Sequence, residues 1–243
     1  MKINTILFDL DDTLLGNNMD TFIPRYFSLL GEYARPLFDD SRQLLQELLV
    51  GTEAMVQNTD PALTNREVFW QVFLARTGLD PEETEQFFDR FYEEHFPQLE
   101  AVTSPRPVAV ELVEACLEQG LQVAIATNPL FPRRAIEHRL AWAGLPVSEY
   151  DFALVTSYET MHAAKPHRAY YQEILERLDA KAESTVMVGD DWENDIQPAA
   201  ALGMAVYWIA PGEAQPPNQG VIAGYGSLEA FYRWWMAPGR WGD

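Results

Sequence analysis

Five short apolar runs in this chain have the length and composition of buried parallel strands. Each run is rich in β-branched or other apolar residues and ends at a polar residue or a glycine. They cover residues 2–8, 121–127, 152–157, 185–189 and 205–210. Segments with helix-like spacing separate the last four runs, at residues 133–144, 167–178 and 193–203. This alternation predicts an α/β fold, a Rossmann-like parallel sheet covered by helices on both faces through right-handed crossovers.

Residues 17–104 break this alternation because they contain no convincing strand. Apolar residues there repeat at i, i+1, i+4 and i+5, which places them on one face of a helix. Such sets lie within residues 44–49, 68–73 and 87–92. The pattern predicts an α-helical bundle, a cap domain of residues 17–104, inserted after the first strand. Residues 1–16 and 105–243 would then form the Rossmann-like catalytic core.

The charge of the chain excludes two classes of partner. The sequence has 37 acidic and 17 basic residues and a formal net charge of −20. Such a surface repels nucleic acids and anionic lipids, so we expect neither as a partner. It also repels small anions, so a phosphate-binding site would need a local cation.

Two further features predict a cytoplasmic setting. The single cysteine, Cys116, lies on the apolar face of a helix-like segment and cannot form an intrachain disulfide, which suits a reducing compartment. The first apolar run meets Asp9 after a few residues, so a signal peptide is not expected, and no run reaches the roughly 18 apolar residues of a membrane span.

Polar and charged side chains follow four of the predicted strands. Open parallel sheets bind ligands at the carboxyl ends of their strands, so we expect these side chains to meet at one edge. They are Asp9 and Asp11 after the first strand, Thr127 and Asn128 after the second, Lys165 after the third, and Asp190, Asp191 and Asp195 after the fourth.

A cluster of carboxylates at one edge needs a cation, and hard oxygen ligands suit Mg²⁺. The metal and Lys165 together would attract a phosphoryl group. One carboxylate could attack phosphorus, and a second could transfer a proton. In an extended segment Asp9 and Asp11 point the same way, whereas Asp12 is out of phase and predicted to shape the turn.

Four sequence motifs, in this order, resemble those of the haloacid dehalogenase-like (HAD) hydrolase superfamily. They are FDLDDTLL at residues 8–15, IATN at 125–128, AAKP at 163–166 and VGDDWENDI at 188–196. The helical insertion after the first motif is similar to the cap of the phosphoglycolate-phosphatase-like branch. The resemblance implies the same Rossmann-like core and a phospho-aspartate chemistry.

The resemblance also implies roles for individual residues. Asp9 matches the nucleophile and Asp11 the general acid/base. Thr127 and Lys165 match the residues that bind the transferring phosphoryl group. Asn128 either donates to the phosphate as well or caps a helix.

The metal ligands implied by the resemblance are the Asp9 carboxylate, the backbone carbonyl of Asp11 and the Asp190 carboxylate. Asp191 and Asp195 are second candidates, and Asp195 would orient water at the metal. One departure from the usual motif is Asp12, which stands where the motif often has glycine.

We therefore expect a Mg²⁺-dependent phosphatase that hydrolyses a small phosphorylated metabolite, an organic phosphate monoester, through an aspartyl phosphate. A sugar phosphomutase and a 2-haloacid dehalogenase are alternatives within the superfamily. A non-catalytic phosphoacceptor or binding protein is an alternative of another class. The sequence leaves the substrate open, as well as the choice between monomer and dimer.

Overall fold

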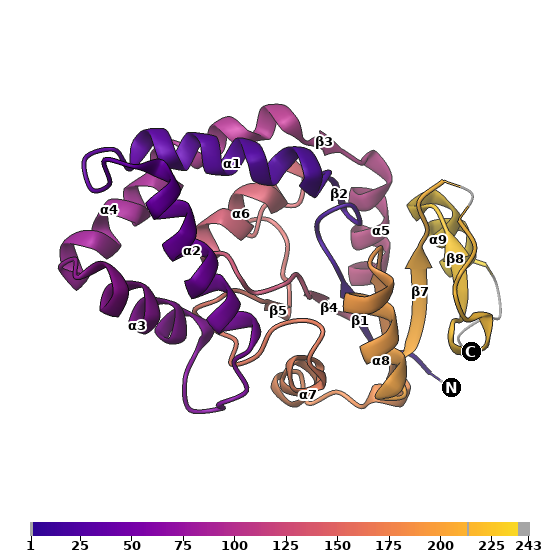
Figure 1. The fold of residues 1–243 in the computed structure, drawn as a ribbon. Coiled ribbons are helices and arrows are strands. Elements are labelled where there is room, and N and C mark those ends of the chain that lie inside the picture. The colour runs from indigo at the N-terminus through magenta and orange to yellow at the C-terminus, as the bar shows by residue number, and fades with distance from the viewer. Residues whose placement is uncertain (1, 213, 238–243) are drawn as a thin grey trace.

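The computed structural model describes residues 2–212 and 214–237, and a six-stranded parallel sheet forms its centre (Figure 1). The strand order is β5-β4-β1-β6-β7-β8. The strands are β1 Thr5–Phe8, β4 Gln122–Ile125, β5 Leu154–Val155, β6 Thr185–Gly189, β7 Ala205–Ile209 and β8 Gly224–Gly226. The predicted α/β fold is confirmed, and the five predicted runs are β1 and β4 to β7. The sixth strand, β8, was not predicted.

Alternation along the strands gives the sheet two buried faces. In β1, Ile6 and Phe8 pack into one apolar cluster and Leu7 into another. The first cluster includes residues of α5 Pro107–Glu118, α6 Arg133–Trp142 and α9 Leu228–Trp235. The second includes residues of α7 Arg168–Arg177 and α8 Gln197–Ala201. Consecutive residues of a strand point to opposite faces of the sheet, and both sets are apolar here because helices cover both faces.

The helices predicted at 133–144 and 167–178 are α6 and α7. The segment predicted as one helix at 193–203 is divided instead. It begins as a π-helix, η3 Trp192–Ile196, and continues as α8, which has Pro198 in its first turn. Proline lacks a backbone N–H and is tolerated in the first turn of a helix, so it fits the start of α8.

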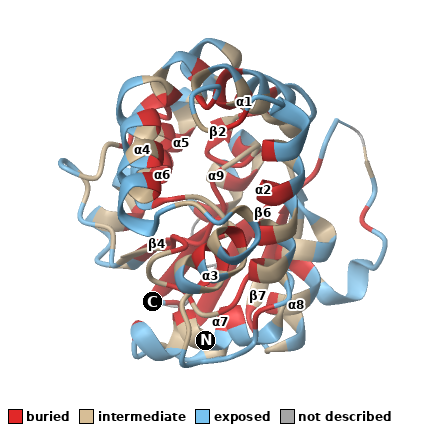
Figure 2. Ribbon diagram, turned by 60° about the vertical axis from the view of Figure 1, so that its left-hand side comes forward, coloured by how far each residue is buried: buried red, intermediate tan, exposed pale blue. Residues whose placement is uncertain are grey.

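A helical insertion lies between β2 Leu15–Gly16 and β3 Ser104–Pro105, which pair antiparallel. It consists of α1 Met19–Tyr33, α2 Ser41–Val56, α3 Asn65–Thr77, α4 Pro81–Glu94 and the 3₁₀-helix η1 Phe96–Val102. Each α-helix begins at a residue whose side chain accepts a backbone N–H: Asn18, Asp40, Thr64 and Asp80. Figure 2 shows that buried residues gather in the sheet and on inward-facing parts of the helices. Within the described ranges, none of the helices combines the length and apolar character needed to cross a membrane.

Two buried asparagines, Asn58 in the loop between α2 and α3 and Asn65 at the start of α3, contact the segments that follow β4 and β5. Asn65 is fully buried, and its Nδ2 donates to the carbonyls of Pro129 at 3.3 Å and Ala163 at 3.2 Å. The Nδ2 of Asn58 donates to the carbonyl of His162 at 2.8 Å. These bonds hold the insertion over the carboxyl ends of the strands.

Candidate active site

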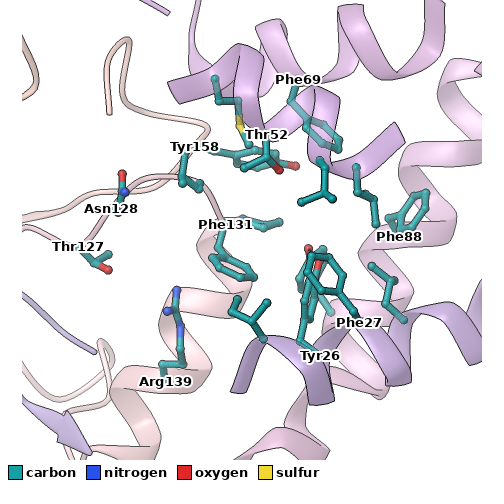
Figure 3. Close-up of a pocket in the computed structure, with 18 of the residues that line it drawn as sticks. Tyr26, Phe27, Thr52, Phe69, Phe88, Thr127, Asn128, Phe131, Arg139 and Tyr158 are labelled. Carbon is teal, nitrogen blue, oxygen red and sulfur yellow. Dashed lines mark hydrogen bonds between the residues drawn. The ribbon is translucent and has the colours of Figure 1, made fainter. Parts of the chain in front are cut away.

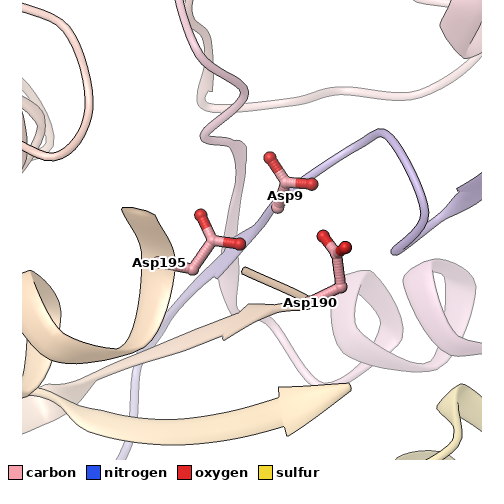
Figure 4. Close-up of side chains that lie close together, drawn as sticks. All are labelled: Asp9, Asp190 and Asp195. Atoms are coloured by element: carbon pink, nitrogen blue, oxygen red, sulfur yellow. The ribbon is translucent and has the colours of Figure 1, made fainter. Parts of the chain in front are cut away.

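The carboxyl ends of β1 and β6 lie side by side and bring Asp9 and Asp190 together (Figure 4). Asp9 directly follows β1, and its backbone N–H donates to Val188 of β6 at 2.9 Å. The ammonium group of Lys165 contacts Asp9 Oδ1 at 2.7 Å and Asp195 Oδ1 at 2.6 Å. Lys165 and Asp195 are almost fully buried, and Asp9 is 7% exposed. Four of the predicted residues therefore share one buried cluster.

Gly189 makes room for Asp195 in this cluster. A Cβ at position 189 would lie 2.7 Å from the Cβ of Asp195 and closer still to its carboxylate. Asp195 is also held by a hydrogen bond, because its Oδ2 accepts the Asp191 backbone N–H at 3.1 Å. The glycine before Asp190 is thus required by the packing of Asp195.

Asp9, Asp190 and Asp195 fit a divalent cation. One ligand atom of each lies within 4.8 Å of the others. With all three carboxylates ionised, the single ammonium of Lys165 would leave two negative charges uncompensated. Burial raises the pKa of Asp9 well above its usual range, and burial followed by repulsion from Asp195 raises the pKa of Asp190 to about 7. A bound cation would relieve this repulsion, and carboxylate oxygens are the ligands that Mg²⁺ prefers.

The neighbouring residues Asp190 and Asp191 have different surroundings. The Asp191 carboxylate begins the helix η3 and accepts the backbone N–H groups of Glu193 and Asn194, each at 2.9 Å. It also accepts the Asn194 side-chain amide at 2.7 Å. Its oxygens are therefore occupied, whereas Asp190 faces Asp9.

Asp11 lies apart from this cluster and has its own cation. Its carboxylate forms an ion pair with Arg139 and accepts the Asn17 side-chain amide at 2.7 Å. Arg139 is 1% exposed, and its guanidinium carbon lies 4.8 Å from the centre of the Phe131 ring. Asp9 contacts Lys165, and Asp11 contacts Arg139. The two carboxylates therefore have separate cationic partners, although their i, i+2 spacing predicted that they would point the same way.

Asp12 occupies a left-handed position in the turn after β1. Its φ is +54°, and its Oδ1 accepts the backbone N–H of Asn17 at 3.2 Å. Aspartate is one of the few residues other than glycine that adopt this conformation routinely. This backbone conformation explains why aspartate can stand where the motif often has glycine.

Thr127 and Asn128 are positioned by backbone and side-chain hydrogen bonds. The Thr127 carbonyl accepts the hydroxyls of Thr156 at 2.7 Å and Tyr170 at 2.8 Å. Asn128 Oδ1 accepts the backbone N–H of Lys165 at 3.2 Å, which ties the second motif to the third. Thr127, Asn128 and Asp11 all line a cavity between the sheet edge and the helical insertion (Figure 3).

Arg139 and Asn17 are site residues that the sequence reasoning missed, and Arg139 is the more informative of the two. The signal was present, because Arg139 lies on the apolar face of α6 with Ala135, Ile136 and Leu140. Arginine on such a face is buried and needs an acidic partner. The pattern could have identified the residue but not Asp11 as its partner.

Comparison with known proteins agrees with this geometry. Residues 3–203 match the family model of the haloacid dehalogenase-like hydrolases. The pyrophosphatase PpaX of Bacillus mycoides is 30% identical over 218 residues, which cover 88% of each chain. A HAD phosphatase from Thermococcus onnurineus has a TM-score of 0.60 at 20% identity, covering 97% of this chain and 98% of that one. A 2-haloacid dehalogenase from Pseudomonas syringae has a TM-score of 0.59 at 22% identity, covering 96% and 99%.

The two solved structures share the fold, and their different activities show that this fold serves more than one reaction. The family membership of this chain rests on two other findings. The family model matches most of the chain, and one relative is 30% identical over 88% of it. This chain is an enzyme that belongs to the haloacid dehalogenase-like hydrolases.

Proposed function

We propose that the protein is a Mg²⁺-dependent phosphatase that hydrolyses a small organic phosphate monoester through an aspartyl phosphate on Asp9. The observation that carries this proposal is the buried cluster in which Lys165 contacts both Asp9 and Asp195 while Asp190 completes a carboxylate triad. Asp9, Asp190 and the backbone carbonyl of Asp11 are the proposed metal ligands. Mg²⁺ would neutralise the carboxylates and the phosphoryl oxygens.

The side chains of this site divide the reaction between them. An oxygen of Asp9 attacks phosphorus, the P–O ester bond breaks, and the leaving oxygen takes a proton from Asp11, which must enter this step in its protonated form. The Asp11 carboxylate then accepts a proton from a water molecule as that water attacks the phosphorus of the aspartyl phosphate. Phosphate leaves and Asp9 is regenerated. Thr127, Asn128 and Lys165 are proposed to bind the phosphoryl oxygens, and Arg139 and Asn17 hold Asp11 in place.

The helical insertion is proposed to be a cap domain of residues 17–104 over a core of residues 1–16 and 105–243. It supplies most of the cavity wall, and buried hydrogen bonds from Asn58 and Asn65 support a closed arrangement that excludes water. The buried single cysteine supports a reducing, cytoplasmic setting.

Pyrophosphate is a second candidate substrate, because the relative with 30% identity is a pyrophosphatase. The test measures phosphate release from pyrophosphate and from a panel of phosphate esters, with Mg²⁺ and with a chelator. We expect release that needs Mg²⁺ and that Asp9→Asn abolishes. Asp9→Asn keeps the size of the side chain, so folding can be verified by thermal unfolding. Undiminished release by Asp9→Asn, or no release from any compound, would refute the proposed function.

A further inference from the structure

The cavity beside the candidate active site has a volume of about 310 Å³ and is almost entirely apolar. Sixteen of its 22 lining residues are aliphatic, aromatic, methionine or proline residues. Figure 3 shows aromatic rings of the helical insertion, among them Phe27, Phe69 and Phe88, around one part of it. A sugar or a second phosphate would lose its hydration there without finding enough hydrogen-bond partners.

One end of this cavity is formed by residues of the candidate active site. Asp11, Thr127, Asn128 and Arg139 belong to its wall, and Figure 3 shows the last three on the side away from Phe27 and Phe88. A phosphoryl group bound at Thr127 and Asn128 would therefore direct its ester substituent into the apolar part. The cavity is placed to receive the leaving group.

The charges in the wall disfavour a second anion on the substrate. Arg139 is the one cation among the lining residues; Asp11 pairs with its Nη1 and balances its charge, while its Nη2 is buried without a hydrogen-bond partner. The other charged lining residue is Asp89, which is acidic. The hydroxyls of Tyr26 and Tyr92 bond to each other at 2.8 Å, and burial raises the pKa of Tyr26 to about 12, so this pair stays neutral.

The volume limits the size of the group. It is close to the lower end of the range for small-molecule sites, roughly 300–1,000 Å³. A cavity of this size suits a compact aromatic ring system or a short alkyl chain.

We infer that the substrate is the monophosphate ester of an apolar alcohol, whose aromatic or alkyl group fills this cavity. The inference rests on the proposed function and narrows it to a substrate class. Hydrolysis breaks the P–O bond, the apolar alcohol leaves with the proton from Asp11, and water supplies the oxygen of the released phosphate. Pyrophosphate and sugar phosphates would be poorer substrates.

The test compares kcat/KM for methyl, butyl, hexyl and naphthyl phosphate with pyrophosphate and a hexose phosphate, all with Mg²⁺. Each methylene that enters the cavity should raise kcat/KM by about fourfold until the cavity is full. Equal rates for methyl and hexyl phosphate, or a preference for pyrophosphate or the sugar phosphate, would overturn the inference. If pyrophosphate or the sugar phosphate is preferred and Asp9→Asn abolishes its hydrolysis, the proposed phosphatase function still stands and only the substrate class is refuted.

Two substitutions on α2 test the cavity itself. Thr52 lines the cavity, whereas the neighbouring Glu53 is exposed and lies outside it. Thr52→Phe should reduce the ratio of hexyl to methyl phosphate turnover at least tenfold, and Thr52→Leu should reduce it less. Glu53→Phe should leave the ratio unchanged, and thermal unfolding verifies that each variant is folded. Equal ratios in Thr52→Phe and Glu53→Phe would contradict the inference.

Discussion

The buried ion pair between Arg139 and Asp11 gives a stability prediction that can be worked from the structure. The Arg139 side chain is 1% exposed and that of Asp11 is 14% exposed. Arg139→Met keeps most of the side-chain volume but removes the guanidinium group, leaving Asp11 with Asn17 as its hydrogen-bond partner. Asp11 thus becomes a nearly buried charge without a counter-charge.

Removing one member of a buried pair costs about 3–5 kcal/mol. Asp11 keeps its bond from Asn17 and some contact with solvent, so we expect the lower end, about 3 kcal/mol. For a chain of this size, each kcal/mol lowers Tm by about 2–4 °C, which gives a decrease of about 6–12 °C. Urea unfolding and calorimetry of Arg139→Met measure both quantities.

The matched control is Arg134→Met on the same helix. The Arg134 side chain is 55% exposed and lies 4.0 Å from Glu93, so its loss should cost less than about 1 kcal/mol. The double variant Arg139→Met/Asp11→Asn removes both charges and should recover part of the lost stability. If Arg139→Met costs no more than Arg134→Met, or if the two changes at positions 139 and 11 are simply additive, the ion pair does not stabilise the fold as argued.

Three further changes test other parts of the site. Gly189→Ala adds a methyl group where Asp195 packs, so it should destabilise the fold by about 1–3 kcal/mol and reduce phosphate release. Normal phosphate release by this variant would show that Asp195 can move to make room for the methyl group. Asn65→Ala removes a buried amide that donates to two carbonyls, so urea unfolding should show a free energy of unfolding lower by about 1–3 kcal/mol, and proteases should cleave the α2–α3 loop faster. An unchanged cleavage rate would contradict the role of Asn65 in holding the helical insertion against the core. Mg²⁺ at about a hundred times its Kd should add about 2.7 kcal/mol to the free energy of unfolding, and the Asp190→Asn variant should lose most of this gain. An equal gain in the unmodified protein and in Asp190→Asn would exclude Asp190 as a metal ligand.

The sequence could predict that several candidate site residues lie together because strand ends carry positional information. A residue directly after a parallel strand lies at the carboxyl edge of the sheet whatever the strand order. This is why Asp9, directly after β1, and Asp190, directly after β6, could be expected together. Lys165 and Asp195 lie further along the segments that follow β5 and β6, so their contact depends on how those segments fold back. The helices of the insertion were predictable from the 3.6-residue period for a similar reason.

Features that depend on packing between elements could not be predicted. The partner of Arg139 depends on how α6 lies against the turn after β1, which no local pattern determines. The cavity depends on the placement of four helices relative to the loop after β4. Strand β8 contains only Gly224, Tyr225 and Gly226 and pairs with β7 through its backbone, so it has no apolar pattern to detect.

The charges of the site imply an order of binding. Within the described residues, Lys165, Arg139 and Arg106 are cations at or beside the candidate site, and each is already paired with a carboxylate. A phosphate dianion that approaches a protein of net charge −20 therefore meets no uncompensated positive charge. A divalent cation held by Asp9, Asp190 and the backbone carbonyl of Asp11 would offset the excess negative charge of the carboxylates there and add an attractive field. We therefore expect the cation to bind first and the phosphate ester to bind only to the loaded site.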